Sequence, residues 1–275
     1  MSTGDTPLSP SDQALLALLA SASAEDLGLL VSYLTSAGHG HGHRTEACRT
    51  LLHARAAGVY PPPVLRTLLA ELQRHGDHNI LKLLRKAERP SYLDIVRDVA
   101  RHFKVEHAED DEVETLESRI LEQLMAQAWE KMSDAERADF IAGLGESAGA
   151  RPIALSGAIA AIQIGGFAAY RIALFTAHAL ARRTTGRGLS MATHDTLERT
   201  VRALAGPVDW AVTAVWTAFG LANPAYRVTV PCVVQIAYMR RKRSLNICPA
   251  CEAPNDAAAR TCQRCGAAMP HAAPP

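Results

Sequence analysis

Two pairs of cysteines near the end of the chain have the spacing of a metal site. Cys248 and Cys251 form one Cys-x-x-Cys pair, and Cys262 and Cys265 form a second pair after ten intervening residues. Four thiolates at this spacing can bind one tetrahedral Zn²⁺, and such a closed ligand set leaves no position for a catalytic water. An iron–sulfur cluster would also accept four thiolates, but paired knuckles are not its usual arrangement. We therefore predict a structural zinc ribbon over residues 244–270.

A glycine-spaced histidine tract is the second feature with metal-binding chemistry. His39, His41 and His43 alternate with glycines between two predicted helices. Three imidazoles on one loop could chelate a transition metal. The simpler interpretation is a solvated loop on which metal affinity is incidental. The sequence leaves both interpretations open, and we favour the simpler one.

Motifs typical of enzymes are missing from the sequence. It contains no Walker A loop, no dinucleotide-binding glycine motif after a strand, no nucleophile elbow and no HExxH. The two remaining cysteines, Cys48 and Cys232, lie in apolar or helical segments and are expected to be buried thiols. We therefore predict no catalytic residue, no small-molecule substrate and no enzymatic activity.

The elements that must position these residues are predicted to be helices. Only 5% of the 275 residues are aromatic, whereas alanine and leucine, which lose little freedom in a helix, are abundant. Capping residues at Ser9 and Ser23 mark the first two helix starts. No run alternates like a strand. Further helices are predicted at about 45–57, 63–75, 78–88, 92–104, 111–131 and 134–143.

The middle of the chain is more apolar than the rest. Residues 152–182 and 207–240 read as helices with narrow polar stripes and wide apolar arcs, and both stretches end in cations. Such helices suit the centre of a helical domain, a bilayer, or a peripheral position at an anionic membrane surface. The polar stripe and the modest length leave these alternatives open.

Charge is distributed unevenly along the chain, although the net charge is only +1. Residues 1–150 hold 15 Lys/Arg against 23 Asp/Glu, whereas residues 151–243 hold 12 against 3. Such a split favours either docking of the two oppositely charged parts or a basic face at a membrane. The ribbon has no Lys/Arg cluster of its own, which argues against nucleic acid as a partner.

Several residue runs carry a resemblance to a known family. They include residues 26–35, 71–73, 130–133, 165–167, 186–189, 206–207, 224–231 and 235–240. These runs resemble the bacterial YaaW-like family over about residues 23–241. That family is commonly grouped under a ubiquinol–cytochrome c chaperone heading, so the resemblance implies a role in assembling respiratory complexes. The histidine tract replaces a charged loop of that family, and the ribbon follows the family core as an appendix.

Together these features predict an all-α protein with a small four-cysteine zinc ribbon. We divide it into an acidic helical bundle (1–150), an apolar, cation-flanked section (151–243), the ribbon (244–270) and a disordered tail (271–275). We expect a non-enzymatic assembly, chaperone-like or adaptor protein with a protein partner. With no secretory signal in the sequence, it is expected in the cytoplasm, at or near the inner membrane face. The alternative is an effector that inserts residues 152–182 and 207–240 into a membrane conditionally.

Overall fold

The chain folds into helices, as predicted. The computed structural model describes residues 8–36, 45–77, 89–135, 137–138, 166–185, 225–248, 250–251, 253, 255 and 259–269. In these ranges it contains eight helices and no strand. Isolated bridge residues occur near the end of the chain, among them the pair Thr261 and Ala268. The chain divides into two compact units. Unit 1 comprises Met1–Leu116 with Ala222–Cys232, and unit 2 comprises Glu117–Leu221 with Val233–Pro275.

Unit 1 contains the first five helices. Local side-chain caps mark the starts of four of them, whereas the helix that follows Pro61 begins with prolines and has no side-chain cap. The Ser9 hydroxyl accepts a hydrogen bond from the Asp12 N–H, and the Ser23 hydroxyl accepts one from the Asp26 N–H. Both caps agree with the sequence-based prediction. The helices are α1 (Pro10–Ala20), α2 (Ala24–Ser36), α3 (Glu46–Ala57), α4 (Pro62–Gly76) and α5 (Tyr92–His102).

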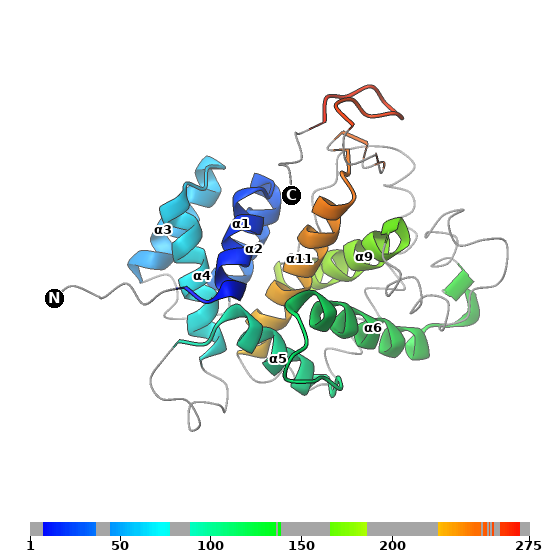
Figure 1. Ribbon diagram of the computed structural model, residues 1–275, viewed down its shortest axis with the longest axis horizontal. Coiled ribbons are helices and arrows are strands. Elements are labelled where there is room, and N and C mark those ends of the chain that lie inside the picture. Colours follow the sequence, from blue (N-terminus) through cyan, green and yellow to red (C-terminus); the bar gives the residue numbers. More distant parts are fainter. Residues whose placement is uncertain are drawn as a thin grey trace. The chain divides into compact units, whose positions relative to one another are not determined.

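The core of unit 1 is built mainly from leucines around α4, which contacts α1, α2, α3 and α5 (Figure 1). A polar link joins α5 to α1, because the Tyr92 N–H donates to Asp12 Oδ1 at 2.9 Å. Asp12 is itself buried, so its carboxylate stabilises a backbone donor that the first turn of α5 would otherwise leave unsatisfied. Residues of this core that are almost completely buried are Leu15, Leu19, Leu30, Leu51, Leu68, Leu72, Tyr92 and Ile95.

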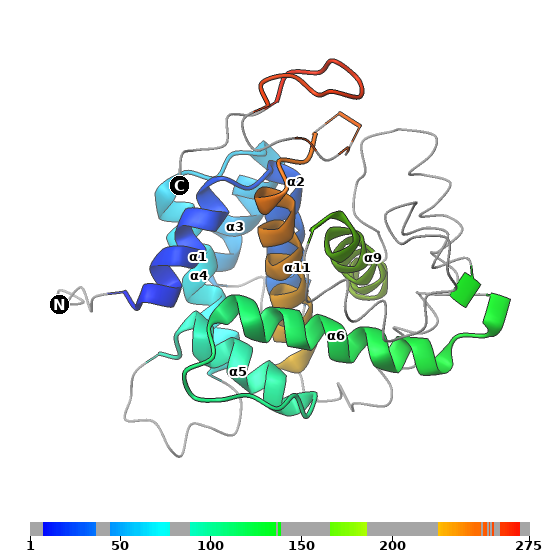
Figure 2. The same ribbon diagram turned by 45° about the vertical axis from the view of Figure 1, so that its right-hand side comes forward.

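Unit 2 holds most of α6 (Val113–Lys131), α9 (Gly166–Thr185) and the second half of α11 (Tyr226–Ser244). α9 lies beside this half of α11 (Figure 2), where the rings of Tyr170 and Tyr238 stack with their centroids 5.7 Å apart. Both tyrosines are buried. These contacts place Tyr170 and Tyr238 in the core of unit 2.

Every residue from 228 to 239 in α11 is buried by this chain, including the polar Thr229 and Gln235. Of the three environments open to the apolar helices, α11 therefore occupies the interior of the protein. Among the helices described, none combines the length and hydrophobicity needed to cross a bilayer.

Several predicted features lie outside the described residues. They are the predicted helix at 78–88, most of the one at 134–143, the apolar residues 207–224, and the histidine tract with His39, His41 and His43.

Candidate metal centre

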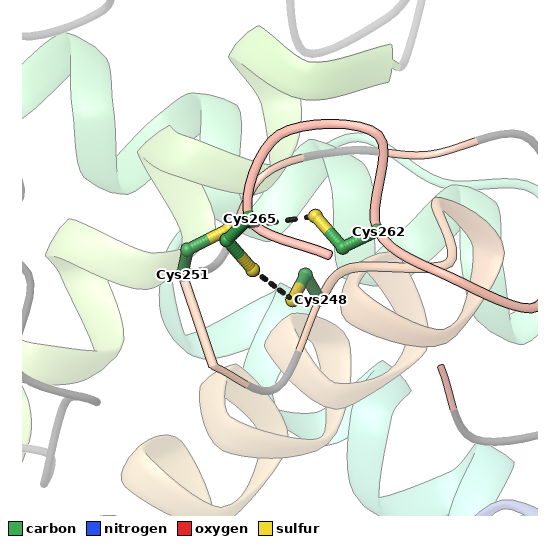
Figure 3. Close-up of side chains that lie close together, drawn as sticks. All are labelled: Cys248, Cys251, Cys262 and Cys265. Atoms are coloured by element: carbon green, nitrogen blue, oxygen red, sulfur yellow. Dashed lines mark hydrogen bonds between the residues drawn. The ribbon is translucent and has the colours of Figure 1, made fainter. Parts of the chain in front are cut away.

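The four cysteines predicted as zinc ligands come together in the structure. The Sγ atoms of Cys248, Cys251, Cys262 and Cys265 all lie within 4.8 Å of one another. The closest pairs join the two knuckles: Cys248 Sγ lies 3.6 Å from Cys265 Sγ, and Cys251 Sγ lies 3.5 Å from Cys262 Sγ (Figure 3). Each knuckle thus contributes one sulfur to each close pair, and all four sulfurs surround a common centre.

The backbone turns of the ribbon explain how so short a segment places these sulfurs. In the first knuckle the Cys248 N–H donates to the Ala253 carbonyl at 2.9 Å. In the second, the Cys262 N–H donates to the Ala267 carbonyl at 2.8 Å. Gly266 ends the second knuckle with a φ of 72°, in the left-handed region that favours glycine. The two knuckles therefore share one backbone hydrogen bond, from the N–H of the first cysteine to the carbonyl five residues later.

Burial separates Cys265 from the other three cysteines. Cys248, Cys251 and Cys262 are buried, whereas Cys265 is exposed. Among the residues that the structure describes, the small apolar cluster around them adds Ala253, Met269 and the partly buried Ala267. So small a cluster cannot stabilise a fold by itself, and this is the usual reason for a structural metal in a short segment.

Proton affinity is unequal among the sulfurs. Burial, followed by hydrogen bonds to the neighbouring cysteines, raises the pKa of Cys251 to about 12, and burial also raises the pKa of Cys248. Burial acts in the same direction on Cys262, but the N–H groups of Cys265 and Arg264 outweigh it and lower the pKa of Cys262 to about 6.

The spacing of the sulfurs fits a single tetrahedral ion. Metal–sulfur bonds of about 2.3 Å in a tetrahedron place the sulfurs about 3.8 Å apart. The two close pairs, at 3.5 and 3.6 Å, and the 4.8 Å limit for all four agree with that value. A cluster of several irons needs a wider separation, because its cysteines bind different iron atoms.

Sequence reasoning missed one polar residue of this centre. Asn255 follows the first knuckle, and its side chain bonds to residues of both knuckles. An asparagine in a turn between two cysteine pairs was the available signal, since asparagine often bonds to nearby backbone.

The isolated cysteines behave as predicted. Cys48 and Cys232 are both buried, and burial raises the pKa of Cys232.

A buried ion pair lies in unit 2 at the end of α11. Arg240 Nε donates to Glu117 Oε2 at 2.9 Å, and the Glu117 side chain is only 3% exposed. The neighbouring Arg241 hydrogen-bonds Ser118, and the Lys242 ammonium lies 5.6 Å from the centre of the Tyr238 ring. The cationic run expected at a membrane face is thus largely engaged in contacts within unit 2. The Glu117 pair also joins the acidic and cationic segments, as internal docking requires.

Unit 1 contains a second polar cluster, at the start of α11. The Tyr226 hydroxyl bonds the Asp98 carboxylate, and the Tyr226 ring stacks on His102 with the centroids 3.8 Å apart. Burial and the nearby Asp98 charge raise the pKa of Tyr226 to about 12. Tyr226 belongs to the run 224–231, one of those that carry the family resemblance, and its contacts with His102 and Asp98 join the start of α11 to α5.

Comparison with known proteins defines the class. The model of the family described as "Ubiquinol-cytochrome C chaperone" matches residues 65–234, and the chain belongs to this family. The family resemblance drawn from the sequence is therefore confirmed. The cysteine centre lies beyond the matched residues.

Individual relatives carry the same relationship. The chain is 31% identical over 230 residues to a UPF0174 protein of Helicobacter pylori strain J99, covering 82% of this chain and 90% of that protein. It is 26% identical over 178 residues to the UPF0174 protein YaaW of Escherichia coli K12, covering 63% of this chain and 70% of that protein. No solved structure matches the chain.

Proposed function

We propose that the chain is a non-enzymatic, chaperone-like assembly protein that carries a structural Zn²⁺ in its ribbon. The observation that supports the chaperone role is the family match over residues 65–234. The closed set of four cysteines agrees with a structural rather than a catalytic metal, because all four tetrahedral positions are taken by protein sulfurs. The helical core would hold the client-binding surface, and the ribbon would add a second contact.

Zinc is the metal that this centre suits best. Four thiolates around one ion form a soft, tetrahedral ligand set, and Zn²⁺ accepts that geometry without a preference of its own. Cys248, Cys251, Cys262 and Cys265 would be the ligands. A single iron ion would fit the same sulfurs, so elemental analysis of the purified chain must identify the metal.

The proposed partner is a protein, and the proposed place of action is the cytoplasmic side of the inner membrane. The family description names ubiquinol–cytochrome c, whose reaction belongs to a membrane complex. Binding would be peripheral, because residues 228–239 of α11 are already buried in protein. Conditional insertion of residues 152–182 and 207–240 would require the chain to give up that core.

Depletion tests the proposed role directly. In source cells that lack the chain, we expect less assembled ubiquinol–cytochrome c reductase on native gels, with normal levels of its messenger RNAs. The wild-type chain should restore assembly. Normal assembly in the depleted cells would contradict the chaperone role. Carbonate-resistant membrane association of the chain would favour the insertion alternative.

A further inference from the structure

The side chain of Asn255 connects the two cysteine knuckles. Asn255 Oδ1 accepts a hydrogen bond from the Gln263 N–H at 2.8 Å, which fixes the second knuckle. Asn255 Nδ2 donates to the Ala253 carbonyl at 2.8 Å, on the side of the first knuckle. The same Nδ2 lies 3.6 Å from Cys262 Sγ, within the range of a hydrogen bond to sulfur.

These three bonds connect the two knuckles through a single side chain, in addition to the close sulfur pairs. Beyond the end of α11, the described residues of the ribbon form no helix and no strand, only single bridge residues such as the Thr261–Ala268 pair. Both partners of that bridge flank the second knuckle, so the bridge does not hold the two knuckles together. A carboxamide is suited to this task, since it offers a donor and an acceptor at fixed geometry.

The contact with sulfur adds an electrostatic role. Four thiolates around a divalent cation leave net negative charge on the sulfurs, and N–H groups directed at them stabilise that charge. Cys262 Sγ receives the Arg264 N–H at 3.4 Å in addition to the Asn255 amide. The Arg264 donor belongs to the backbone of the second knuckle itself, whereas Asn255 supplies its donor from outside that knuckle.

We propose that Asn255 is a positioning residue of the metal centre: it fixes the second knuckle against the first and orients the Cys262 thiolate toward the ion. This inference rests on the proposed metal site. Residues that hold metal ligands in place in this way commonly contribute about 10–100-fold to metal affinity. Asn255 thereby takes the place of the extended strand pairing that the described ribbon residues do not show.

The test compares metal binding by the full chain, two Asn255 variants, one control variant and one chain that lacks two of the cysteines. Zinc affinity is measured by competition with a chromophoric chelator, and the thiolate–metal bond is followed in the visible spectrum of the Co²⁺ form. Asn255→Ala should lower zinc affinity about 10–100-fold and shift the sulfur-to-cobalt charge-transfer band. Asn255→Asp should lower it at least as much, because the carboxylate keeps the acceptor for Gln263 but replaces the donor near Cys262 with negative charge. Thr261→Ala is the matched control in the same ribbon and should bind like the wild type.

Several outcomes would overturn the inference. Wild-type affinity and an unchanged cobalt spectrum in both Asn255 variants would remove the positioning role. Wild-type behaviour of Asn255→Asp alone would leave only the Gln263 link and would refute the contact with Cys262. A wild-type chain that binds neither metal would instead refute the proposed zinc site, so the two failures are distinguishable. A chain with Cys248→Ser and Cys262→Ser measures metal bound elsewhere and is subtracted.

Discussion

Individual backbone positions determine whether the four sulfurs can meet. Gly266 has a φ of 72°, and a Cβ added there would meet no atom within 4 Å. Substitution with alanine therefore costs only the strain of a left-handed residue, about 1–2 kcal/mol. The space around the residue is not limiting, so the effect isolates backbone conformation from packing.

Gly266→Ala should weaken zinc binding by about 5–30-fold, because the backbone strain of about 1–2 kcal/mol is present mainly in the metal-bound turn. Gly58→Ala is the control, since Gly58 has a similar φ of 67° and equally open space at the end of α3. That control should lower the free energy of unfolding and leave zinc affinity unchanged. Chelator competition and denaturant titration measure the two quantities, and equal zinc affinity for Gly266→Ala and the wild type would contradict the account.

The raised pKa of Tyr226 predicts how stability depends on pH. The folded-state pKa is about 12, whereas an unfolded tyrosine ionises near pH 10. The stabilising effect is therefore complete below about pH 10 and is lost as the pH rises toward 12. Tyr226→Phe should reduce the decline in the free energy of unfolding over that range.

Unfolding in denaturant at pH 9 to 11 measures this difference, and ultraviolet titration counts tyrosinates in the folded chain. At about pH 10.5 the wild type and Tyr226→Phe should contain the same amount of tyrosinate, because Tyr226 is still protonated. A shortfall of about three-quarters of a tyrosinate in the variant at that pH would show that Tyr226 ionises with an ordinary pKa.

At the scale of helices, the buried pair of Glu117 and Arg240 joins α6 to α11 within unit 2. Removing one partner of a buried pair leaves the other charge uncompensated, at a cost of about 3–5 kcal/mol. The Arg240 side chain is 20% exposed and retains some water, so the low end applies. Glu117→Gln should lower the free energy of unfolding by about 3 kcal/mol.

Denaturant unfolding is again the measurement, with Asp134→Asn as the matched control. Asp134 pairs with Arg137 at 3.1 Å but is fully exposed, and such pairs contribute little to stability. If Glu117→Gln and Asp134→Asn were equally stable, the pair would not be an important connection between α6 and α11.

Helix positions were largely predictable from sequence, and their contacts were not. Ser9 and Ser23 mark helix starts because a cap is local, so a few neighbouring residues define it. Glu117 and Arg240 are 123 positions apart, and their charges alone predicted only that acidic and cationic segments might pair. The cysteine cluster was predictable because metal chemistry restricts ligand spacing. Asn255 was missed because its role depends on the fold of the turn.

At the scale of the whole molecule, the ribbon has its own small core. The buried cluster of the ribbon is separate from the leucine-rich helical core. Its members are Cys248, Cys251, Ala253, Cys262 and Met269. The family match ends at residue 234, before the ribbon begins. Loss of metal should therefore unfold the ribbon and leave the helices folded.

Thiol reactivity measures this consequence on the intact chain. With metal bound, all six cysteines should react slowly, because Cys48 and Cys232 are buried and the other four are ligands. A strong chelator should expose four reactive thiols with little change in far-ultraviolet circular dichroism, and denaturant should expose all six. Loss of most helical signal on chelation would show that the helices depend on the metal.

Native mass spectrometry of the intact chain, together with elemental analysis, measures whether one zinc ion holds the four-cysteine ribbon. We predict one zinc per chain, retained in the triple variant His39→Ala, His41→Ala and His43→Ala, and lost when Cys248 and Cys262 are replaced by serine. A purified chain without metal that does not take up zinc, or zinc retained after both cysteine substitutions, would contradict the account.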